Sequence, residues 1–362
     1  MIITYIHLDS PEDELQVRLR CRNFSDAINR VGWHSAHLLD MNSFIQDTPD
    51  AHKVCAASDL LIVHLVRRCF QGSVLQAIAY WKAHDKKVIV DFDQAIGRLT
   101  PDVPGDSFWL EDAPLGGGAN GVRGSQAVLT PLEEFKQGLG MIDAAIVSSS
   151  RLMADWPRYM DVHEVPDYLN TDQYPGFKQA HEDEIWIGVA NGTRNASMRD
   201  SGLLSALENV CRRHPHVKLV TPAIEEDGHG LEGIRASQRM SYPLNSFEEW
   251  ADILPKLDIG LLPICGDYDL RLGRISLLEF MVSKTPWLVS NQPVLRDLAR
   301  FGKFVQNTPD AWETAILKAM DNMDTLQKRA AGEPFLFALS QDINVNIDKV
   351  LKLFTRILIQ AK

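Results

Sequence analysis

The chain has few cysteines, and no two of them have the spacing of a metal site or a redox motif. Its 362 residues include five cysteines, which are scattered along the sequence without a CxxC pair. An odd and dispersed set argues against both a disulfide framework and a structural zinc site. A reducing compartment fits this usage best, and we therefore expect a cytoplasmic protein.

Long apolar runs and an excess of positive charge are also lacking. No run reaches the roughly 18 apolar residues that cross a bilayer, so we expect no transmembrane segment, although peripheral attachment to a membrane stays open. The N-terminal MIITYIHLD has no basic region before an apolar core and is typical of a strand rather than a signal peptide. The net charge of −11 argues against general electrostatic capture of nucleic acid, which leaves room only for a local basic cleft.

Several motifs that would identify an enzyme class are missing. The sequence contains no HExxH metal motif, no GxSxG nucleophile elbow and no GxGxxG dinucleotide loop. The histidines show no ligand spacing, so we expect no bound metal and no cofactor. These absences count against a zinc hydrolase, a serine hydrolase and a nicotinamide-dependent enzyme.

What is present is a regular alternation of strand-like and helix-like segments. Apolar runs such as LLIVHL, KVIVDF and DAAIVSSS alternate with helical patterns through about the first 170 residues. The pattern then restarts with IWIGVA, VKLVTPA, DIGLLPI and PWLVS, which again alternate with helical segments. Strands that are apolar on both faces indicate parallel sheets covered by helices. The sequence therefore predicts an α/β protein with two Rossmann-like domains.

The domain boundary is expected where apolar periodicity gives way to Gln, Pro, Gly, His and acidic residues. We place the first domain at 1–175 and the second at 176–335. Residues 336–362 are expected to form a C-terminal helix that packs back across to the first domain. Ligands of such domains bind at the carboxyl ends of the strands, which we expect to face a central cleft.

The strand KVIVDF leads into two carboxylates, Asp91 and Asp93, which share one face at its carboxyl end. An Asp-x-Asp pair can hold a divalent metal, act as an acid or base, or simply end a strand. No neighbouring feature supports a metal, so an acceptor-side or catalytic role is the preferred interpretation. His64 ends the preceding strand and is a second candidate for this side, although a core histidine would look the same.

The segment 258–291 carries the strongest signal for an anion site. Arg271 and Arg274 come just before a helix, where cations oppose the helix dipole unless an anion is bound. Guanidinium groups and helix amides together would suit a diphosphate. Within that helix, Glu279 and Ser276 share a face, and a carboxylate there suits the paired hydroxyls of a ribose. The alternative is two surface arginines and a half-exposed glutamate.

A second candidate for phosphate binding is the loop VANGTRNAS, which follows a strand and precedes a helix. Gly188 and Gly192 would allow close approach of the backbone, and Asn191 and Thr193 would supply neutral donors. A plain connection with a helix cap is the alternative.

These segments together resemble the GT-B glycosyltransferases, in particular the GT4-like group. The resemblance rests on Pro263, the arginines after it, Leu278-Glu279-Phe280-Met281 and Pro286-Trp287-Leu288-Val289-Ser290, and on HEVPDYLNTDQY before the second domain. It covers most of the chain in the same order. Two positions depart from the family pattern, because Leu272 replaces a common glutamate and Ser276 a common lysine.

The resemblance implies a transferase that moves a sugar from a UDP- or GDP-sugar, without a metal and with retention of configuration. The second domain would bind the donor, with Tyr242 in the loop that reads the base. The first domain would bind the acceptor, with Asp9 and His64 on that side. The sequence does not identify the acceptor, which could be a glycan, a lipid, a protein, a small molecule or a nucleic-acid base. A two-domain UDP-sugar epimerase and a catalytically silent binding protein are the alternatives. The oligomeric state is not indicated.

Overall fold

The computed structural model describes residues 1–8, 14–64, 72–96, 130–179, 181–190, 193–223, 231–243 and 247–360. The chain forms two compact units. Unit 1 comprises Met1–Pro166 together with Ile347–Lys362, and unit 2 comprises Asp167–Asn346. The division thus falls earlier than the boundary expected at residue 175. None of the helices in the described residues is long and apolar enough to cross a membrane.

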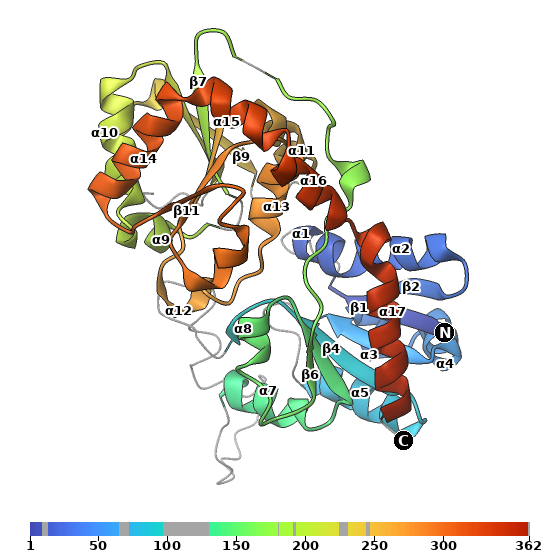
Figure 1. Ribbon diagram of the computed structural model, residues 1–362. Coiled ribbons are helices and arrows are strands. Elements are labelled where there is room, and N and C mark those ends of the chain that lie inside the picture. The colour runs from blue at the N-terminus through green and yellow to red at the C-terminus, as the bar shows by residue number, and fades with distance from the viewer. Residues whose placement is uncertain are drawn as a thin grey trace. The chain divides into compact units, whose positions relative to one another are not determined.

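Unit 1 contains a six-stranded parallel sheet in the order β2-β1-β3-β4-β5-β6 (Figure 1). Its strands are β1 (Ile2–His7), β2 (Ser35–Asp40), β3 (Leu60–His64), β4 (Lys87–Phe92), β5 (Ala144–Val147) and β6 (Val162–Glu164). The central strands β3, β4 and β5 consist almost entirely of buried residues, as expected for a sheet covered on both faces.

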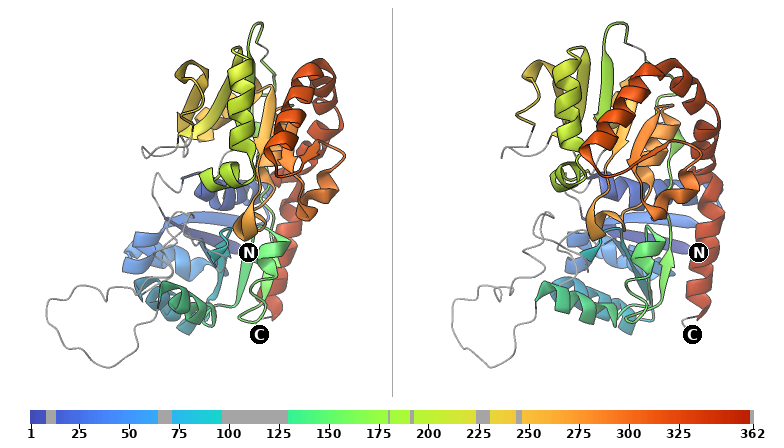
Figure 2. Two further views of the ribbon diagram at one scale, coloured as in Figure 1. Left: turned by 90° about the vertical axis from the view of Figure 1, so that its left-hand side faces the viewer. Right: turned by 60° about the vertical axis from the view of Figure 1, so that its left-hand side comes forward.

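The helices of unit 1 cover both faces of this sheet, with α2 and α5 on opposite sides (Figures 1 and 2). The segment after β1 is helical from Glu14 to Val31, as α1 (Glu14–Val17), a π-helical turn (Arg18–Arg22) and α2 (Asn23–Val31). The sequence pattern from Leu15 to Val31, followed by a glycine, predicts this helix, and it ends at Gly32 in the left-handed conformation with φ 77°. The other helices are α3 (Met41–Gln46), α4 (Pro49–Ala57), α5 (Gly72–Ala83), α7 (Pro131–Leu139) and α8 (Ser150–Met153).

Unit 2 contains a second six-stranded parallel sheet, in the order β12-β11-β10-β7-β8-β9. Its strands are β7 (Ile185–Val189), β8 (Val217–Ala223), β9 (Arg239–Pro243), β10 (Ile259–Leu262), β11 (Trp287–Ser290) and β12 (Lys303–Val305). Its helices are α9 (Asn195–Asp200), α10 (Leu203–Arg213), α11 (Phe247–Ile253), α12 (Gly266–Asp269), α13 (Ile275–Val282), α14 (Pro309–Asp321), α15 (Met323–Ala330) and α16 (Glu333–Ser340).

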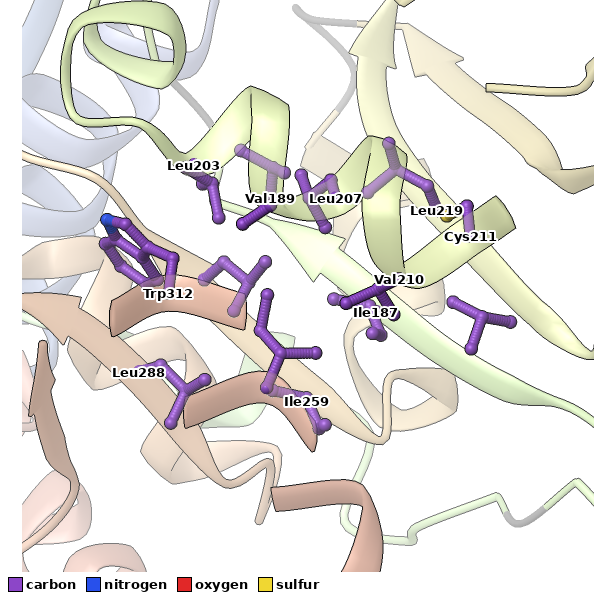
Figure 3. Close-up of a cluster of buried hydrophobic side chains, with 14 of the residues drawn as sticks. Ile187, Val189, Leu203, Leu207, Val210, Cys211, Leu219, Ile259, Leu288 and Trp312 are labelled. Atoms are coloured by element: carbon purple, nitrogen blue, oxygen red, sulfur yellow. The ribbon is translucent and has the colours of Figure 1, made fainter. Parts of the chain in front are cut away.

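One face of the second sheet packs against α10 and α14 in a continuous apolar core (Figure 3). Leu203, Leu207 and Val210 of α10 lie over the strand residues, and Trp312 of α14 is fully buried beside them. Burial of these apolar side chains contributes about 25 cal/mol to folding stability for each Å² of apolar surface removed from water. This core fixes the strands whose carboxyl ends carry the polar residues described below.

The last helix, α17 (Ile343–Gln360), begins in unit 2 and continues in unit 1. Its buried positions are Ile343, Ile347, Val350, Leu351, Phe354 and Ile357, the spacing of an amphipathic helix. The two parallel sheets with covering helices confirm the predicted α/β class. The sequence pattern of residues 312–330 predicts one helix, which is wrong, because the chain breaks at Asn322 between α14 and α15.

Candidate functional site

Each sheet contains a point at which the direction of strand winding reverses. In unit 2 the first strand, β7, lies between β8 and β10, so the reversal falls between β7 and β10. In unit 1 the first strand, β1, lies between β2 and β3, so the reversal falls between β1 and β3. Loops diverge at such points, and ligands of open α/β sheets bind there, outside the carboxyl ends of the strands.

At the reversal in unit 2, the loop after β7 is tied to the loop after β10 by one carboxylate. Asp269 accepts hydrogen bonds from Arg194 Nε (2.8 Å), from Ser197 Oγ (2.5 Å) and from the backbone N–H of Cys265 (2.8 Å). Arg194 also donates to the carbonyl of Cys265 and lies 5.2 Å from the ring centre of Tyr268. The Asp269 side chain is 4% exposed and that of Arg194 is 11% exposed, so this link is well shielded from water.

Beside this link, two polar side-chain atoms are buried without a hydrogen-bond partner among the described residues. They are Thr193 Oγ1 and Asn195 Oδ1, at the start of α9. A buried polar atom without a partner is costly and calls for an explanation. A ligand with hydroxyl groups at this position would supply the partners that Thr193 and Asn195 lack.

The two predicted arginines lie in different environments. The Arg271 side chain is 7% exposed, and its Nη1 contacts both the carbonyl oxygen of Asp267 (2.7 Å) and the Oδ1 atom of Asp267 (3.0 Å). The Arg274 side chain is 34% exposed and forms an ion pair with Asp297 at 2.6 Å. Arg274 is also the N-cap residue of α13, as its predicted place before the helix requires.

Glu279 lies in the interior of unit 2, where it is 3% exposed. Its carboxylate accepts hydrogen bonds from Trp250 Nε1 (2.9 Å) and Tyr174 Oη (3.1 Å). Burial raises the pKa of Glu279 to about 7, against the lowering effect of these two bonds, and the charge of Asp167 adds to the rise. The half-exposed glutamate considered from the sequence is therefore wrong, and Glu279 is a buried hydrogen-bond acceptor.

Two other residues expected at the donor site have packing roles. A Cβ atom on Gly188 would lie 2.3 Å from Leu257 Cδ1, so this glycine is required by the packing of β7. Tyr242 is 1% exposed, stacks on Trp250 at 4.8 Å and belongs to β9 rather than to a loop. The phosphate approach at Gly188 and the base-reading role of Tyr242 stay predictions.

The remaining predicted donor residues are placed as follows. Thr193 lies two residues before α9, and Ser276 is partly buried in the first turn of α13. Asn191 and Gly192 lie outside the described residues, as does Asp9 on the acceptor side.

At the reversal in unit 1, polar residues form a row across neighbouring strands. The register pairs His7 with Asp40 and His64 with Asp91, and it places His64 next to His7 across β1 and β3. His7 Nδ1 lies 3.0 Å from the carbonyl of Leu8, which can only accept, so this nitrogen carries the proton.

His64 is fully buried, and neither of its ring nitrogens has a hydrogen-bond partner among the described residues. Burial, together with the nearby charge of Arg20 and the neighbouring His7, lowers the pKa of His64 to about 3. The imidazole is therefore neutral at physiological pH and offers one donor and one acceptor.

Asp91 forms a forked ion pair with Arg20, which reaches it from the π-helical turn after β1. The Oδ1 atom of Asp91 accepts from Arg20 Nη2 (2.7 Å) and Nε (3.1 Å), and each side chain is 1% exposed. Arg20 Nη1 also donates to the carbonyl of Val165 at 2.7 Å. This geometry gives Asp91 a structural role as the partner of a buried cation. Asp93 lies just past β4 and is partly buried.

Reasoning from the sequence missed three residues of these sites, namely Arg20, Arg194 and Asp269. Asp269 and Arg194 could have been found from their positions in the loops that follow β10 and β7. Arg20 gave no such signal, because the π-helical turn that aims it inward is not visible in the pattern. Among the described residues, no three His, Cys, Asp or Glu side chains are grouped so as to hold a metal ion.

Comparison with known proteins gives similarity at the level of structure only. No protein-family model matches the chain, and no curated protein matches its sequence. An α-glucosyltransferase solved in complex with UDP has a TM-score of 0.67 at 11% identity, covering 98% of this chain and 100% of that one. The sucrose-phosphate synthase of Thermosynechococcus elongatus has a TM-score of 0.63 at 12% identity, with 99% and 100% coverage.

A third similar structure, from Listeria monocytogenes, is assigned as a UDP-N-acetylglucosamine 2-epimerase. Its TM-score is 0.53 at 11% identity, covering 97% of this chain and 94% of that one. Identities this low establish architecture and nothing finer. The two parallel six-stranded sheets, their helices and these similarities together show that the chain has the GT-B fold.

Proposed function

We propose that the protein is a glycosyltransferase that takes a sugar from a nucleoside-diphosphate donor held by unit 2. The observation that carries the proposal is the site at the reversal between β7 and β10. There Arg194, Asp269 and Arg271 come from the two diverging loops, beside buried polar atoms with no hydrogen-bond partner in the described part of the chain. Guanidinium groups at the carboxyl ends of strands are suited to phosphate oxygens.

In the proposed reaction, the bond between the anomeric carbon and the diphosphate oxygen breaks, and a bond to an acceptor oxygen forms. The nucleoside diphosphate leaves with the electron pair, so negative charge grows on its oxygens. In this proposal Arg271 and Arg274 stabilise that charge. Because cations fill this role, we propose that the reaction needs no metal.

We propose further that the enzyme is GT4-like and retains configuration at the anomeric carbon. In that case the acceptor proton passes to a donor phosphate oxygen on the same face, and no protein base is required. The sealed pair of Asp91 with Arg20 supports this view, because a carboxylate held by a buried guanidinium is a poor proton acceptor. Glu279 would accept hydrogen bonds from the ribose hydroxyls through its remaining lone pairs.

The acceptor is proposed to bind at the reversal between β1 and β3 of unit 1. His64 supports this assignment, since its neutral ring offers a donor and an acceptor that the described residues leave unused. A hydroxyl group of the acceptor could accept a hydrogen bond from the protonated ring nitrogen of His64 or donate one to the other nitrogen.

The proposal is tested by incubating the protein with labelled UDP- and GDP-sugars. Slow hydrolysis of the donor without an acceptor is expected, together with binding of the nucleoside diphosphate. Arg271→Ala is expected to weaken that binding by at least tenfold. Unchanged affinity in both Arg271→Ala and Glu279→Ala, each verified to be folded by circular dichroism, would refute the donor site.

A sugar-nucleotide epimerase is the second candidate, and the similarity to the Listeria monocytogenes structure favours it specifically. An epimerase would invert C2 of the sugar without any acceptor. Nuclear magnetic resonance of the incubated UDP-sugar separates the two, because epimerisation changes the C2 configuration whereas transfer or hydrolysis releases UDP. Binding of the donor without either change would indicate a silent binding protein.

A further inference from the structure

The short segment after β10 carries two carboxylates, Asp267 and Asp269, that differ sharply in their surroundings. Asp269 is 4% exposed and holds Arg194, Ser197 and the Cys265 N–H together. Asp267 is 58% exposed, and its Oδ1 atom lies 3.0 Å from Nη1 of Arg271. The two residues have the same charge and lie on the same helical turn, α12.

The surroundings of Asp269 indicate a residue that builds the site. Its two oxygens receive three donors from both loops, so it fixes the distance between the strand ends of β7 and β10. Removing its charge would leave the guanidinium of Arg194 buried without its counter-ion. Breaking a buried pair on one side is far more costly than breaking one at the surface.

The surroundings of Asp267 indicate a carboxylate that can be exchanged. Arg271 is itself 7% exposed, whereas Asp267 stands mostly in water, so the ion pair has one shielded member and one solvated member. A carboxylate and a phosphate present similar oxygen acceptors to a guanidinium group. An ion pair with a solvated member contributes little to stability, so an incoming phosphate can replace it at low cost.

We propose that Asp267 competes with the diphosphate of the donor for Arg271, whereas Asp269 holds the site in shape. This inference rests on the proposed function, since it assigns a competitor to the same phosphate site. Asp267 occupies Nη1 when the site is empty and swings into solvent when the diphosphate binds. The competition therefore weakens the binding of a diphosphate, whereas an uncharged nucleoside, which does not need Arg271, is unaffected.

The test measures the dissociation constants of UDP and GDP by calorimetry, with uridine and guanosine as uncharged probes. Asp267→Asn is expected to tighten binding of the diphosphate about two- to tenfold and to leave nucleoside binding unchanged. Asp269→Asn is expected to weaken binding of the diphosphate at least tenfold. Asp321→Asn, at an exposed carboxylate that ends α14, removes the same charge elsewhere in unit 2 and serves as the matched control.

A second comparison keeps the test specific to Arg271. In an Arg271→Ala background, Asp267→Asn is expected to have no further effect, because the two residues act through one contact. The inference is overturned if Asp267→Asn weakens binding or leaves it unchanged. It is equally overturned if the gain persists without Arg271, or if Asp321→Asn gives the same gain. Failure of the wild-type protein to bind either diphosphate would instead refute the proposed function.

Discussion

Both sheets place an arginine–aspartate pair at the carboxyl end of their strands, but the two pairs meet water differently. In unit 1, Arg20 and Asp91 are each 1% exposed, and the guanidinium also holds the carbonyl of Val165. In unit 2, Asp267 is 58% exposed opposite a shielded Arg271. The first pair is closed, and the second has one side open to solvent.

This difference separates a residue that holds a fold from one that is available to a ligand. A closed pair has lost its hydration and depends wholly on its partner, so neither member can be released without a large cost. The open pair keeps most of its hydration and can exchange partners. The strand-end carboxylate of the first sheet, which the sequence suggested as catalytic, is thus the less available of the two.

The largest expected effect tests the closed pair. Arg20→Ala leaves Asp91 charged and buried, and we expect a loss of about 3 to 5 kcal/mol in the free energy of unfolding. Urea denaturation followed by circular dichroism measures it. Replacing both partners, Arg20→Met with Asp91→Leu, should recover much of the loss. Full stability of Asp91→Asn combined with lost turnover would return Asp91 to a catalytic role.

The next effect concerns the pH dependence of stability that the buried carboxyl group of Glu279 produces. Because its pKa rises from 4.5 to about 7, the folded state of Glu279 binds more protons than the unfolded state between these values. Its contribution is fully present below pH 4.5 and is lost as the pH rises through 7, a change of about 3 kcal/mol. Glu279→Gln should therefore flatten the fall in melting temperature between pH 5 and pH 8.

Glu182→Gln, at an exposed position, is the control, because removing a charge there is expected to leave the slope in place. An identical pH slope in Glu279→Gln and in the wild-type protein would contradict the assignment.

A smaller effect tests whether β7 is tightly packed at Gly188. Gly188→Ala brings a methyl group against Leu257, and overpacking of this kind costs about 1 to 3 kcal/mol. Thermal unfolding measures the cost, and Leu257→Ala in the same chain should relieve part of it. A variant of normal stability with weakened nucleotide binding would instead support the phosphate approach first expected at this glycine.

The smallest effect tests the buried histidine of unit 1, His64. His64→Leu removes two ring nitrogens that have no partner among the described residues, so stability at pH 7 should change by less than about 1 kcal/mol. The substitution should also remove the loss of stability that a pKa of about 3 imposes as the pH falls below 6.5. Marked destabilisation at pH 7 would show that His64 is held by a group other than a ligand.

Strong apolar periodicity made most of the architecture predictable. The strands β3, β4, β7, β8, β10 and β11 lie where the apolar runs predicted them, and α13 and α17 follow their helical patterns. The short strands β6, β9 and β12 were not predicted. The Arg239–Pro243 segment of β9 alternates weakly and contains a proline, so a turn was the natural interpretation.

The site was predictable only in part, because charge pairing is decided by contacts distant in sequence. Arg271 and Arg274 were found from their place before a helix. The fork between Arg20 and Asp91 spans 71 residues, and nothing near either residue indicates it. Tyr242 was expected in a loop and Glu279 facing a ribose, whereas stacking on Trp250 buries Tyr242 and hydrogen bonds inside unit 2 hold Glu279.

The division of the chain has a consequence for the order of synthesis. The final helix supplies Val350, Phe354 and Ile357 to unit 1, although that unit is otherwise made from the beginning of the chain. All of unit 2 must be translated before this helix emerges, a delay of about 10 to 40 seconds at common elongation rates of roughly 5 to 20 residues per second. The first sheet therefore waits on the ribosome with an apolar surface uncovered, whereas the second can fold as soon as it is complete.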